Sequence, residues 1–315
     1  MLPFVRMLEY GNIAPSVFLG ISEQITFNST GYNPPGRNYT SSCSTNVEEF
    51  PYVYFYGGIT GTGGGITGTG STYLNDFFYY NASDNTFYQI PSSNLRNLRS
   101  TPLVYTPDGY IYGFGGANSS NNASSQFFRH KVGTNSIEII SNDSGRPPAR
   151  YNHAGVCIGN EIFYFGGQSS SVKEVIVAYN YITKVWRTVR SGITTPTLNV
   201  ESPSVIFYEG LVYLVIGSTM YNYDPSTNAF TQVIPSFSPI TSSGAGFIIV
   251  DGTLYYILGT FVTKREPNGT WTRIRTNTSS AYYTWYGYIA GKREAYSFFG
   301  GGGANDRSTV MYKFT

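Results

Sequence analysis

Short hydrophobic runs rich in tyrosine and phenylalanine recur along the chain, and most of them end in a pair of glycines. Four copies are clear, and two weaker copies keep a single glycine: residues 52–58, 110–116, 162–167 and 295–301, then residues 211–218 and 253–260. Their first glycines are spaced by 58, 51, 51, 42 and 41 residues: Gly57, Gly115, Gly166, Gly217, Gly259 and Gly300. Aromatic residues favour pleated strands and glycine favours turns. The pattern predicts an all-β repeat with the period of a propeller blade.

Two further elements follow the same period. A turn followed by a large apolar residue opens a strand at five places: Phe87, Ile137, Trp186, Phe230 and Trp271. Most of these follow an aromatic-rich strand, as at residues 77–81 and 220–224. A proline-rich segment with an arginine precedes the glycine pair at residues 34–43 and 147–157, and Arg99 stands in a similar place. Each repeat therefore predicts four strands.

These residues resemble the kelch family, whose blades carry an Arg-x-x-His before the first strand, a double glycine, a tyrosine and a tryptophan. One repeat matches every position: Arg150, His153, Gly166, Gly167, Tyr179 and Trp186. The resemblance covers roughly residues 23–315 and implies a six-bladed β-propeller of four-stranded kelch blades. Two repeats depart from the family pattern because Ser218 and Thr260 replace the second glycine. In three repeats the fourth strand lacks the tryptophan.

The two ends of the chain are complementary. The residues after the last glycine pair provide a third strand but no fourth, whereas residues 22–37 can be aligned with the fourth-strand segment at residues 135–150. Because four-stranded blades cover their faces only by packing in a ring, we expect an N-terminal strand to join the C-terminal blade and close the ring. The predicted domains are a lead segment, residues 1–21, and the propeller, residues 22–315.

Composition excludes several classes of protein. Only 12% of the residues are charged, the net charge is +2, and the basic residues form no run, so nucleic-acid binding is not expected. The longest apolar stretch, residues 246–258, is interrupted by Asp251 and Gly252 and is too short for a membrane span. Arg6 and Glu9 interrupt any signal-peptide core. Two cysteines, Cys43 and Cys157, are too few for a disulfide framework.

A tandem duplication of GGITGTG at residues 57–63 and 64–70 lies between the second and third strands of the first repeat. It lacks the lysine and helix of a phosphate loop, so we favour a flexible or hairpin-like extension, with a binding loop as the alternative. The candidate binding residues here are Gly57, Gly58, Thr60, Gly64, Gly65 and Thr67. Three arginines before the first strands have two interpretations: bonds to carbonyls of the neighbouring blade, which we favour, or a polar ring for acidic or sugar ligands. They are Arg37, Arg99 and Arg150.

No catalytic site is predicted. His130 and His153 are the only histidines, and the resemblance to kelch blades implies that His153 packs between blades. A copper site like that of galactose oxidase would need both histidines, which lie in different strands, so we expect no metal and no cofactor. Residues 264–271 fail to match a sialidase Asp-box, and aspartates fall mostly in turns. No acid/base pair can be named from spacing.

Eight Asn-x-Ser/Thr sequons occur where roughly five would arise by chance, mostly in predicted loops. They are Asn28, Asn38, Asn81, Asn118, Asn122, Asn142, Asn268 and Asn277. With the scarcity of charge, they favour a non-enzymatic, extracellular or virion-surface glycoprotein that acts in adhesion, coat formation or surface assembly. Its partner would be another copy, another surface protein or a glycan.

Two alternatives are a sugar-active enzyme on a kelch scaffold, such as a sialic acid epimerase-like or galactose-oxidase-like protein, and an intracellular adaptor, which would need an attached BTB or F-box domain. The long connections lie on one expected face: residues 57–73, 116–125, 141–150 and 190–202. Tight turns at residues 107–109 and 251–252 lie on the other face. We expect binding on the face with the long loops.

Overall fold

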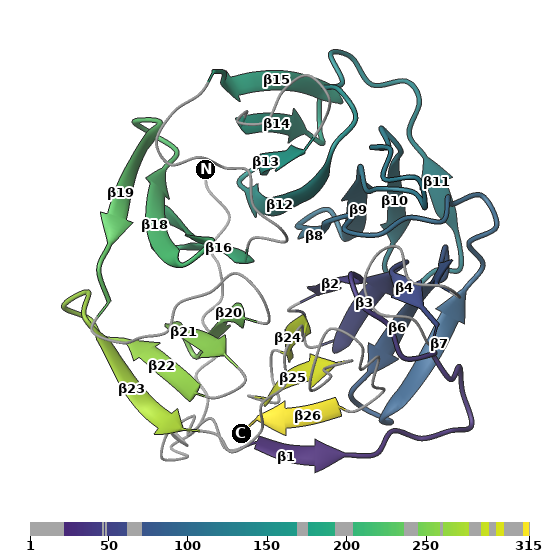
Figure 1. Ribbon diagram of the computed structural model, residues 1–315, viewed down its shortest axis with the longest axis horizontal. Coiled ribbons are helices and arrows are strands. Elements are labelled where there is room, and N and C mark those ends of the chain that lie inside the picture. The colour runs from purple at the N-terminus through teal and green to yellow at the C-terminus, as the bar shows by residue number, and fades with distance from the viewer. Residues whose placement is uncertain are drawn as a thin grey trace, which may run out of the picture.

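The computed structural model describes residues 22–45, 47, 49–61, 71–168, 176–192, 204–235, 245–258, 261–276, 285–289, 294–298 and 311–314. Every regular element among these residues is a β-strand. The four-stranded sheets stand around a common centre (Figure 1), which confirms the prediction of an all-β propeller with four-stranded blades. No described helix is long and apolar enough to cross a membrane. Residues 1–21 lie outside the described residues.

Five sheets come from consecutive segments, and we number them as blades 1 to 5, each with its innermost strand first. Blade 1 contains β2 (Ser41–Ser44), β3 (Tyr52–Tyr56), β6 (Phe77–Asn81) and β7 (Thr86–Ile90). Blade 2 contains β8 (Leu103–Thr106), β9 (Tyr110–Phe114), β10 (Phe127–Lys131) and β11 (Ile137–Ile139). Blade 3 contains β12 (Tyr151–Ile158), β13 (Glu161–Gln168), β14 (Ile176–Asn180) and β15 (Val185–Arg190).

Blade 4 contains β16 (Ser204–Tyr208), β17 (Leu211–Ile216), β18 (Thr219–Asp224) and β19 (Ala229–Val233). Blade 5 contains β20 (Ala245–Val250), β21 (Thr253–Leu258), β22 (Phe261–Arg265) and β23 (Trp271–Thr276). A sixth four-stranded sheet, the terminal sheet, joins β24 (Trp285–Ile289), β25 (Glu294–Phe298) and β26 (Met311–Phe314) to the N-terminal strand β1 (Ser22–Ile25). A two-stranded sheet of β4 (Ile59–Thr60) and β5 (Thr72–Tyr73) branches from blade 1.

Strand β1 pairs antiparallel with β26, from Ser22 opposite Phe314 to Ile25 opposite Met311. The chain then crosses to blade 1, where Tyr32 N–H donates to the carbonyl of Phe87 at 2.8 Å. Figure 1 shows the two ends of the described chain side by side in this sheet. The innermost strands also contact one another in sequence, with β24 against both β20 and β2.

The core lies between the blades. Aromatic and aliphatic residues of adjacent sheets form separate clusters between blades 1 and 2, 2 and 3, 3 and 4, and 4 and 5. The glycine pair allows this close approach at the end of the second strand. A Cβ on Gly57 would lie 2.2 Å from the carbonyl oxygen of Leu98, and the φ of Gly57 is +61°. Both facts exclude an ordinary side chain there.

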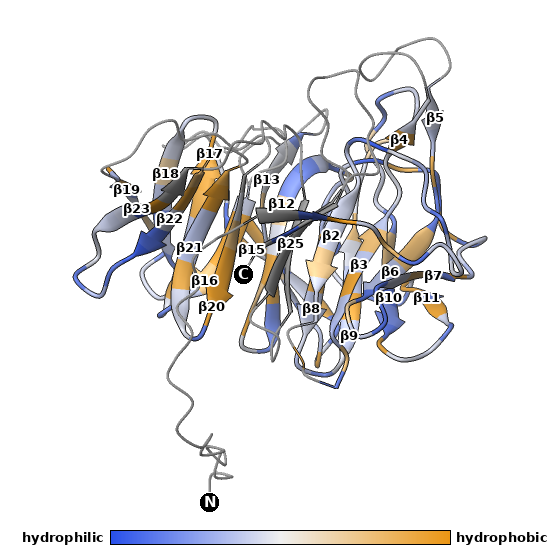
Figure 2. Ribbon diagram, turned by 90° about the horizontal axis from the view of Figure 1, so that it is seen from below, coloured by the Kyte–Doolittle hydropathy of each residue, from blue (hydrophilic) through white to orange (hydrophobic). Residues whose placement is uncertain are grey.

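The connections from β3 to β6, β9 to β10 and β7 to β8 emerge on one face, which we call the loop face. The β4–β5 hairpin stands above this face at the upper right of Figure 2, and the turn between β8 and β9 lies on the opposite side. The predicted placement of the duplicated segment on the loop face is therefore correct for its described residues.

Candidate functional site

The β4–β5 hairpin rises from a fixed base. Ile59 exchanges backbone hydrogen bonds with Asn38 at 2.8 and 3.0 Å, and Thr60 Oγ1 donates to the carbonyl of Gly36 at 2.8 Å. Ile59 is fully buried and Tyr73, opposite it, is 6% exposed. Of the two forms predicted for the duplicated segment, a flexible or a hairpin-like extension, the described base has the hairpin form. Three of the candidate binding residues lie outside the described residues: Gly64, Gly65 and Thr67.

Arg37 is a structural residue. Its guanidinium donates to both oxygens of Asp76 at 2.7 Å and to the carbonyl of Gly57 at 3.0 Å, and it lies 4.7 Å from the centre of the Phe78 ring. Tyr32 Oη donates to the same carboxylate, and burial raises the pKa of that hydroxyl. Arg37 is fully buried. The contact with a carbonyl favours the structural interpretation over a polar ring for ligands, but the carbonyl belongs to the same blade and not to a neighbouring blade, as we had expected.

Arg150 has the same place in blade 3. Its Nη1 donates to the carbonyl of Gly166 at 3.2 Å, and the residue is 2% exposed. Burial lowers the pKa of the guanidinium to about 10 because a low-dielectric site disfavours the charged form. Like Arg37, Arg150 therefore donates a hydrogen bond to the glycine pair of its own blade.

Arg99 does not occupy the equivalent place, so the predicted equivalence of the three arginines is wrong. Leu98 does: its carbonyl accepts from Gly58 N–H as that of Arg150 accepts from Gly116 N–H, both at 2.9 Å. Arg99 matches Asn38 instead, since it exchanges backbone bonds with Ala117 as Asn38 does with Ile59. The arginine is displaced by one residue, and its side chain therefore points elsewhere.

Arg99 lies where three blades meet on the loop face. Its guanidinium is between the rings of Tyr39 and Tyr151, at 5.4 and 5.1 Å, and Nη2 donates to Asn121 Oδ1 at 3.0 Å. Nη1 makes two longer contacts, 3.4 Å each, with Ser100 and Asn152. The residue is 2% exposed, and its recorded partners are oxygens of neutral groups. This buried cation connects the lead-in segments of blades 1 and 2 to the start of β12 in blade 3.

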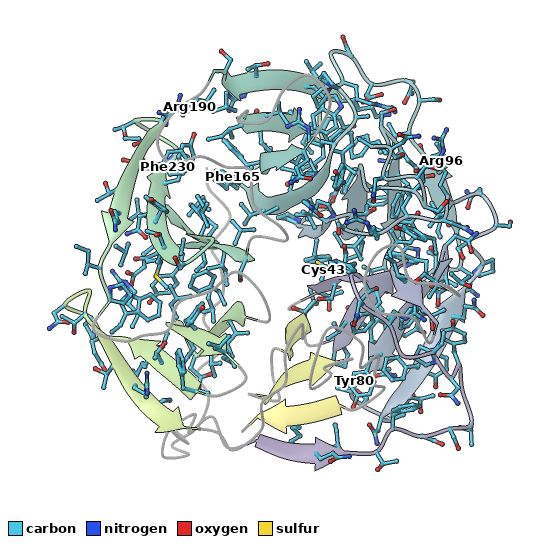
Figure 3. The ribbon with its side chains drawn as sticks, in the orientation of Figure 1. Cys43, Tyr80, Arg96, Phe165, Arg190 and Phe230 are labelled. Atoms are coloured by element: carbon cyan, nitrogen blue, oxygen red, sulfur yellow. The ribbon has the colours of Figure 1, made fainter. Side chains whose placement is uncertain are left out.

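A pocket of about 290 Å³ opens on the loop face beside blade 2. Three segments line it: Asn94 and Arg96 before β8, Ser125 to Phe127 at the start of β10, and Ile139 at the end of β11 with Ile140, Ser141 and Arg146 after it. Figure 3 shows Arg96 near the outer strands of this blade and Cys43 near the centre of the ring. Sequence reasoning missed this pocket.

One signal for the pocket is visible in retrospect. Gly115 N–H donates to the carbonyl of Gln126 at 2.9 Å, as Gly57 N–H donates to that of Asp76 at 3.1 Å, so Gln126 stands where blade 1 has its carboxylate. Blade 2 therefore has leucine and glutamine where blade 1 has the arginine and aspartate of a buried ion pair. The Gln126 side chain is free to bind the backbone of Arg96 instead, at 3.0 Å.

Both histidines are packed between blades. The His153 ring lies 5.5 Å from that of Phe114 and 5.6 Å from that of Tyr164, which places it between blades 2 and 3, as expected. His130 lies between blades 1 and 2, 5.2 Å from the rings of both Tyr54 and Phe77. Desolvation lowers the pKa of each imidazole, and the charge of Arg150 adds to the effect on His153.

A family model for the Kelch motif matches residues 149–192, which cover blade 3 from Arg150 through the end of β15. This Kelch motif and the propeller arrangement of the four-stranded sheets support a kelch-repeat β-propeller family for the chain. No curated protein matches it. Kelch propellers generally act as protein-binding scaffolds and are typically non-catalytic.

The described part of this kelch propeller contains no group of three or more His, Cys, Asp or Glu residues that could hold a metal ion. Burial raises the pKa of the Cys43 thiol to about 12 and that of Cys157 to about 11. Both thiols therefore stay protonated near neutral pH and are poor nucleophiles.

The sequons of the propeller differ in accessibility. Four asparagines are exposed: Asn28, Asn122, Asn142 and Asn268. Asn81 and Asn118 are half-buried, and Asn277 lies outside the described residues. Asn38 is only 6% exposed and its backbone is hydrogen-bonded at the hairpin base. A glycan cannot be accommodated there in the folded protein, which corrects the prediction for this residue.

Proposed function

We propose that this kelch propeller is a non-enzymatic, outward-facing binding protein that meets its protein partner through the loop face. The observation that carries the proposal is the β4–β5 hairpin, which stands out from that face on a base of buried contacts. A rigid ring with protruding loops is a common platform for recognition, because the loops can vary without disturbing the core.

The ring itself is proposed to be a closed six-bladed propeller, with the terminal sheet as its sixth blade. Two observations support this: six four-stranded sheets are formed by the described strands, and β1 pairs with β26. A closed ring leaves no blade face uncovered, which suits a scaffold that must hold its loops in fixed positions.

The proposed setting is extracellular, at the surface of a cell or a virion, with adhesion, coat formation or surface assembly as the role. Support comes from the low charge content and from four sequon asparagines that are exposed on the described surface. N-linked glycans require such exposed positions. The intact mass of the native protein should fall on enzymatic deglycosylation. An unchanged mass that equals the chain mass would contradict the glycoprotein assignment.

Removing one GGITGTG unit, residues 64–70, tests the choice of face. We expect the free energy of unfolding to change by less than about 0.6 kcal/mol, because the closure entropy of a loop depends weakly on its length. Attachment to the natural surface, or self-association measured by sedimentation velocity, should weaken clearly.

The matched control is Lys184→Gln, in the tight turn between β14 and β15 on the opposite face. It should leave attachment and assembly unchanged. If the shortened protein binds normally and changes in the tight turns abolish binding, the partner uses the other face.

A further inference from the structure

The backbone of Arg96 is held rigidly at the edge of the pocket by two buried side chains. Its N–H donates to Gln126 Oε1 at 3.0 Å, and its carbonyl accepts from Tyr56 Oη at 2.5 Å. Gln126 Nε2 in turn donates to Tyr56 Oη at 3.2 Å, so one hydrogen-bonded chain joins blades 1 and 2 beneath this residue. The contacts of Arg96 that stabilise the fold therefore come from its main chain.

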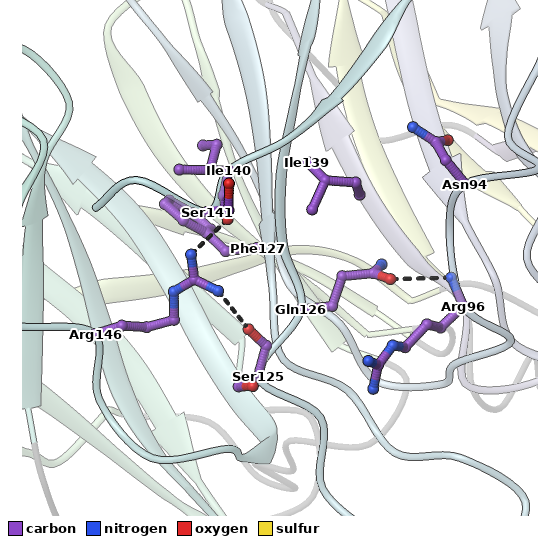
Figure 4. A pocket seen from close by; sticks show the side chains of 9 residues that line it. All are labelled: Asn94, Arg96, Ser125, Gln126, Phe127, Ile139, Ile140, Ser141 and Arg146. Carbon is purple, nitrogen blue, oxygen red and sulfur yellow. Dashed lines mark hydrogen bonds between the residues drawn. The ribbon is translucent and has the colours of Figure 1, made fainter. Parts of the chain in front are cut away.

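The guanidinium of Arg96, by contrast, makes no hydrogen bond or ion pair with any described residue, and the residue is exposed. In Figure 4 the dashed line from Gln126 ends at the main-chain nitrogen of Arg96, and no dashed line reaches the guanidinium. The other arginine of the pocket is fully occupied. Arg146 binds the carboxylate of Asp143 and the carbonyls of Ser125 and Ile140. One positive charge at this site is thus available to a ligand.

The wall opposite Arg96 is aliphatic. Ile139, in the short outer strand β11, is 39% exposed, and Ile140 beneath it is 4% exposed. The side chains of Asn94 and Ser141 provide polar atoms at the edge. Phe127 is the aromatic residue of the lining and is fully buried, with the Arg146 guanidinium 5.7 Å from its ring centre. The described lining therefore offers no open aromatic face on which a sugar ring could stack.

We infer that this pocket binds an acidic residue of the partner protein, through a carboxylate held by Arg96, with a neighbouring aliphatic side chain of the partner packed on Ile139. The guanidinium can receive a carboxylate in the two-bond geometry that makes such pairs strong and directional. Burial of an aliphatic side chain on Ile139 adds apolar area next to that bond. This inference rests on the proposed function and names the partner's chemistry.

Selection of peptides from a random phage-displayed library tests the inference. The full chain is produced in bacteria, so that Asn142, next to Ser141, carries no glycan. We expect enriched sequences with Asp or Glu beside Leu, Ile or Val. A synthetic peptide of the enriched sequence should bind Arg96→Gln roughly 10- to 100-fold more weakly, the usual cost of a lost hydrogen bond to a charged group. Lys184→Gln, which removes the same charge from the opposite face, should bind as the unchanged protein does.

Replacing Glu by Gln in the peptide should cause a similar loss, and Ile139→Ser should weaken binding separately. Failure to enrich acidic peptides, or binding that is unchanged in Arg96→Gln, overturns the inference. So does binding of sialyllactose that Arg96→Gln abolishes, because it would assign the pocket to acidic glycans. The Arg96→Gln result is independent of the loop deletion. If only the loop deletion weakens attachment, the proposed function stands and this pocket is not its acidic-residue site.

Discussion

Substitutions at single positions make the interfaces between blades chemically different from one another. In blade 1, Arg37 and Asp76 form a buried bidentate pair, which completes the hydrogen bonding of both charges. In blade 2, Leu98 is 1% exposed and packs in the apolar cluster between blades 1 and 2, and Gln126 is neutral. Replacing a buried ion pair by residues that need no counter-charge is tolerated in proteins. The substitution leaves a polar side chain available to hold Arg96.

The two buried histidines predict how stability depends on pH. Both imidazoles have a pKa below its usual value in the folded state, because burial disfavours the charged form. The unfolded chain binds their protons near pH 6.5, while the folded chain does not. Stability is therefore complete above about pH 6.5 and is lost as pH falls below it, by up to about 1.4 kcal/mol per pH unit for each histidine.

Urea unfolding between pH 7.5 and 5.5 measures this dependence. His130→Gln and His153→Gln should each be less steep than the unchanged protein, and the double variant should be nearly flat, whatever their stability at pH 7.5. Parallel curves for all four proteins would show that these histidines do not cause the loss.

A left-handed turn recurs where the chain enters the first strand of blades 1, 2 and 3. Tyr39, Ser100 and Asn152 all have a left-handed backbone, with φ of 56°, 54° and 57°. They follow Asn38, Arg99 and Tyr151, which lie against the glycine pairs of their own blades. Residues other than glycine rarely adopt this conformation, and it persists where the surrounding contacts hold it. This repeated turn places Tyr39, Arg99 and Tyr151 together at the junction of three blades.

At the scale of the whole molecule, a short N-terminal segment joins the terminal sheet to blade 1. Beyond β1, Phe27 packs edge-on against Phe87 with ring centres 5.0 Å apart, and the two lie in the cluster on the face of blade 1 that is turned away from blade 2. The segment therefore both completes one sheet and covers part of the next.

Deleting residues 22–29 should abolish cooperative thermal unfolding, although the segment looks peripheral. The deletion leaves the edge of β26 unpaired and removes Phe27 from its cluster, and an unpaired edge also promotes aggregation. Calorimetry and light scattering report both effects. Phe27→Ala, the control that removes packing alone, should lower the melting temperature and keep the transition cooperative. A truncated protein that melts like the full one contradicts the proposed closure of the ring.

The sequence by itself determined the class of fold, because its signals are local. Aromatic runs that end in Gly57 and Gly115 specify strands and their ends, since only glycine fits the left-handed turn against a neighbouring carbonyl. The place of His153 between blades was implied by the resemblance of blade 3 to the kelch family. The hairpin at the duplicated segment was also predictable, because the duplication lies between two strands of one repeat.

Only the tertiary structure decided which polar residues are free to act. The lead-ins of Arg37, Arg99 and Arg150 look alike in sequence, yet a displacement by one residue puts Arg99 against two tyrosines and Leu98 in the core. The sequence around Asn38 predicts an accessible glycosylation site, but the β4–β5 hairpin, which begins about 20 residues later, buries this asparagine. Arg96 carries no motif at all. Its availability depends on residues 56 and 126, which contact its main chain only because adjacent blades pack face to face. A local sequence pattern cannot predict such contacts between blades.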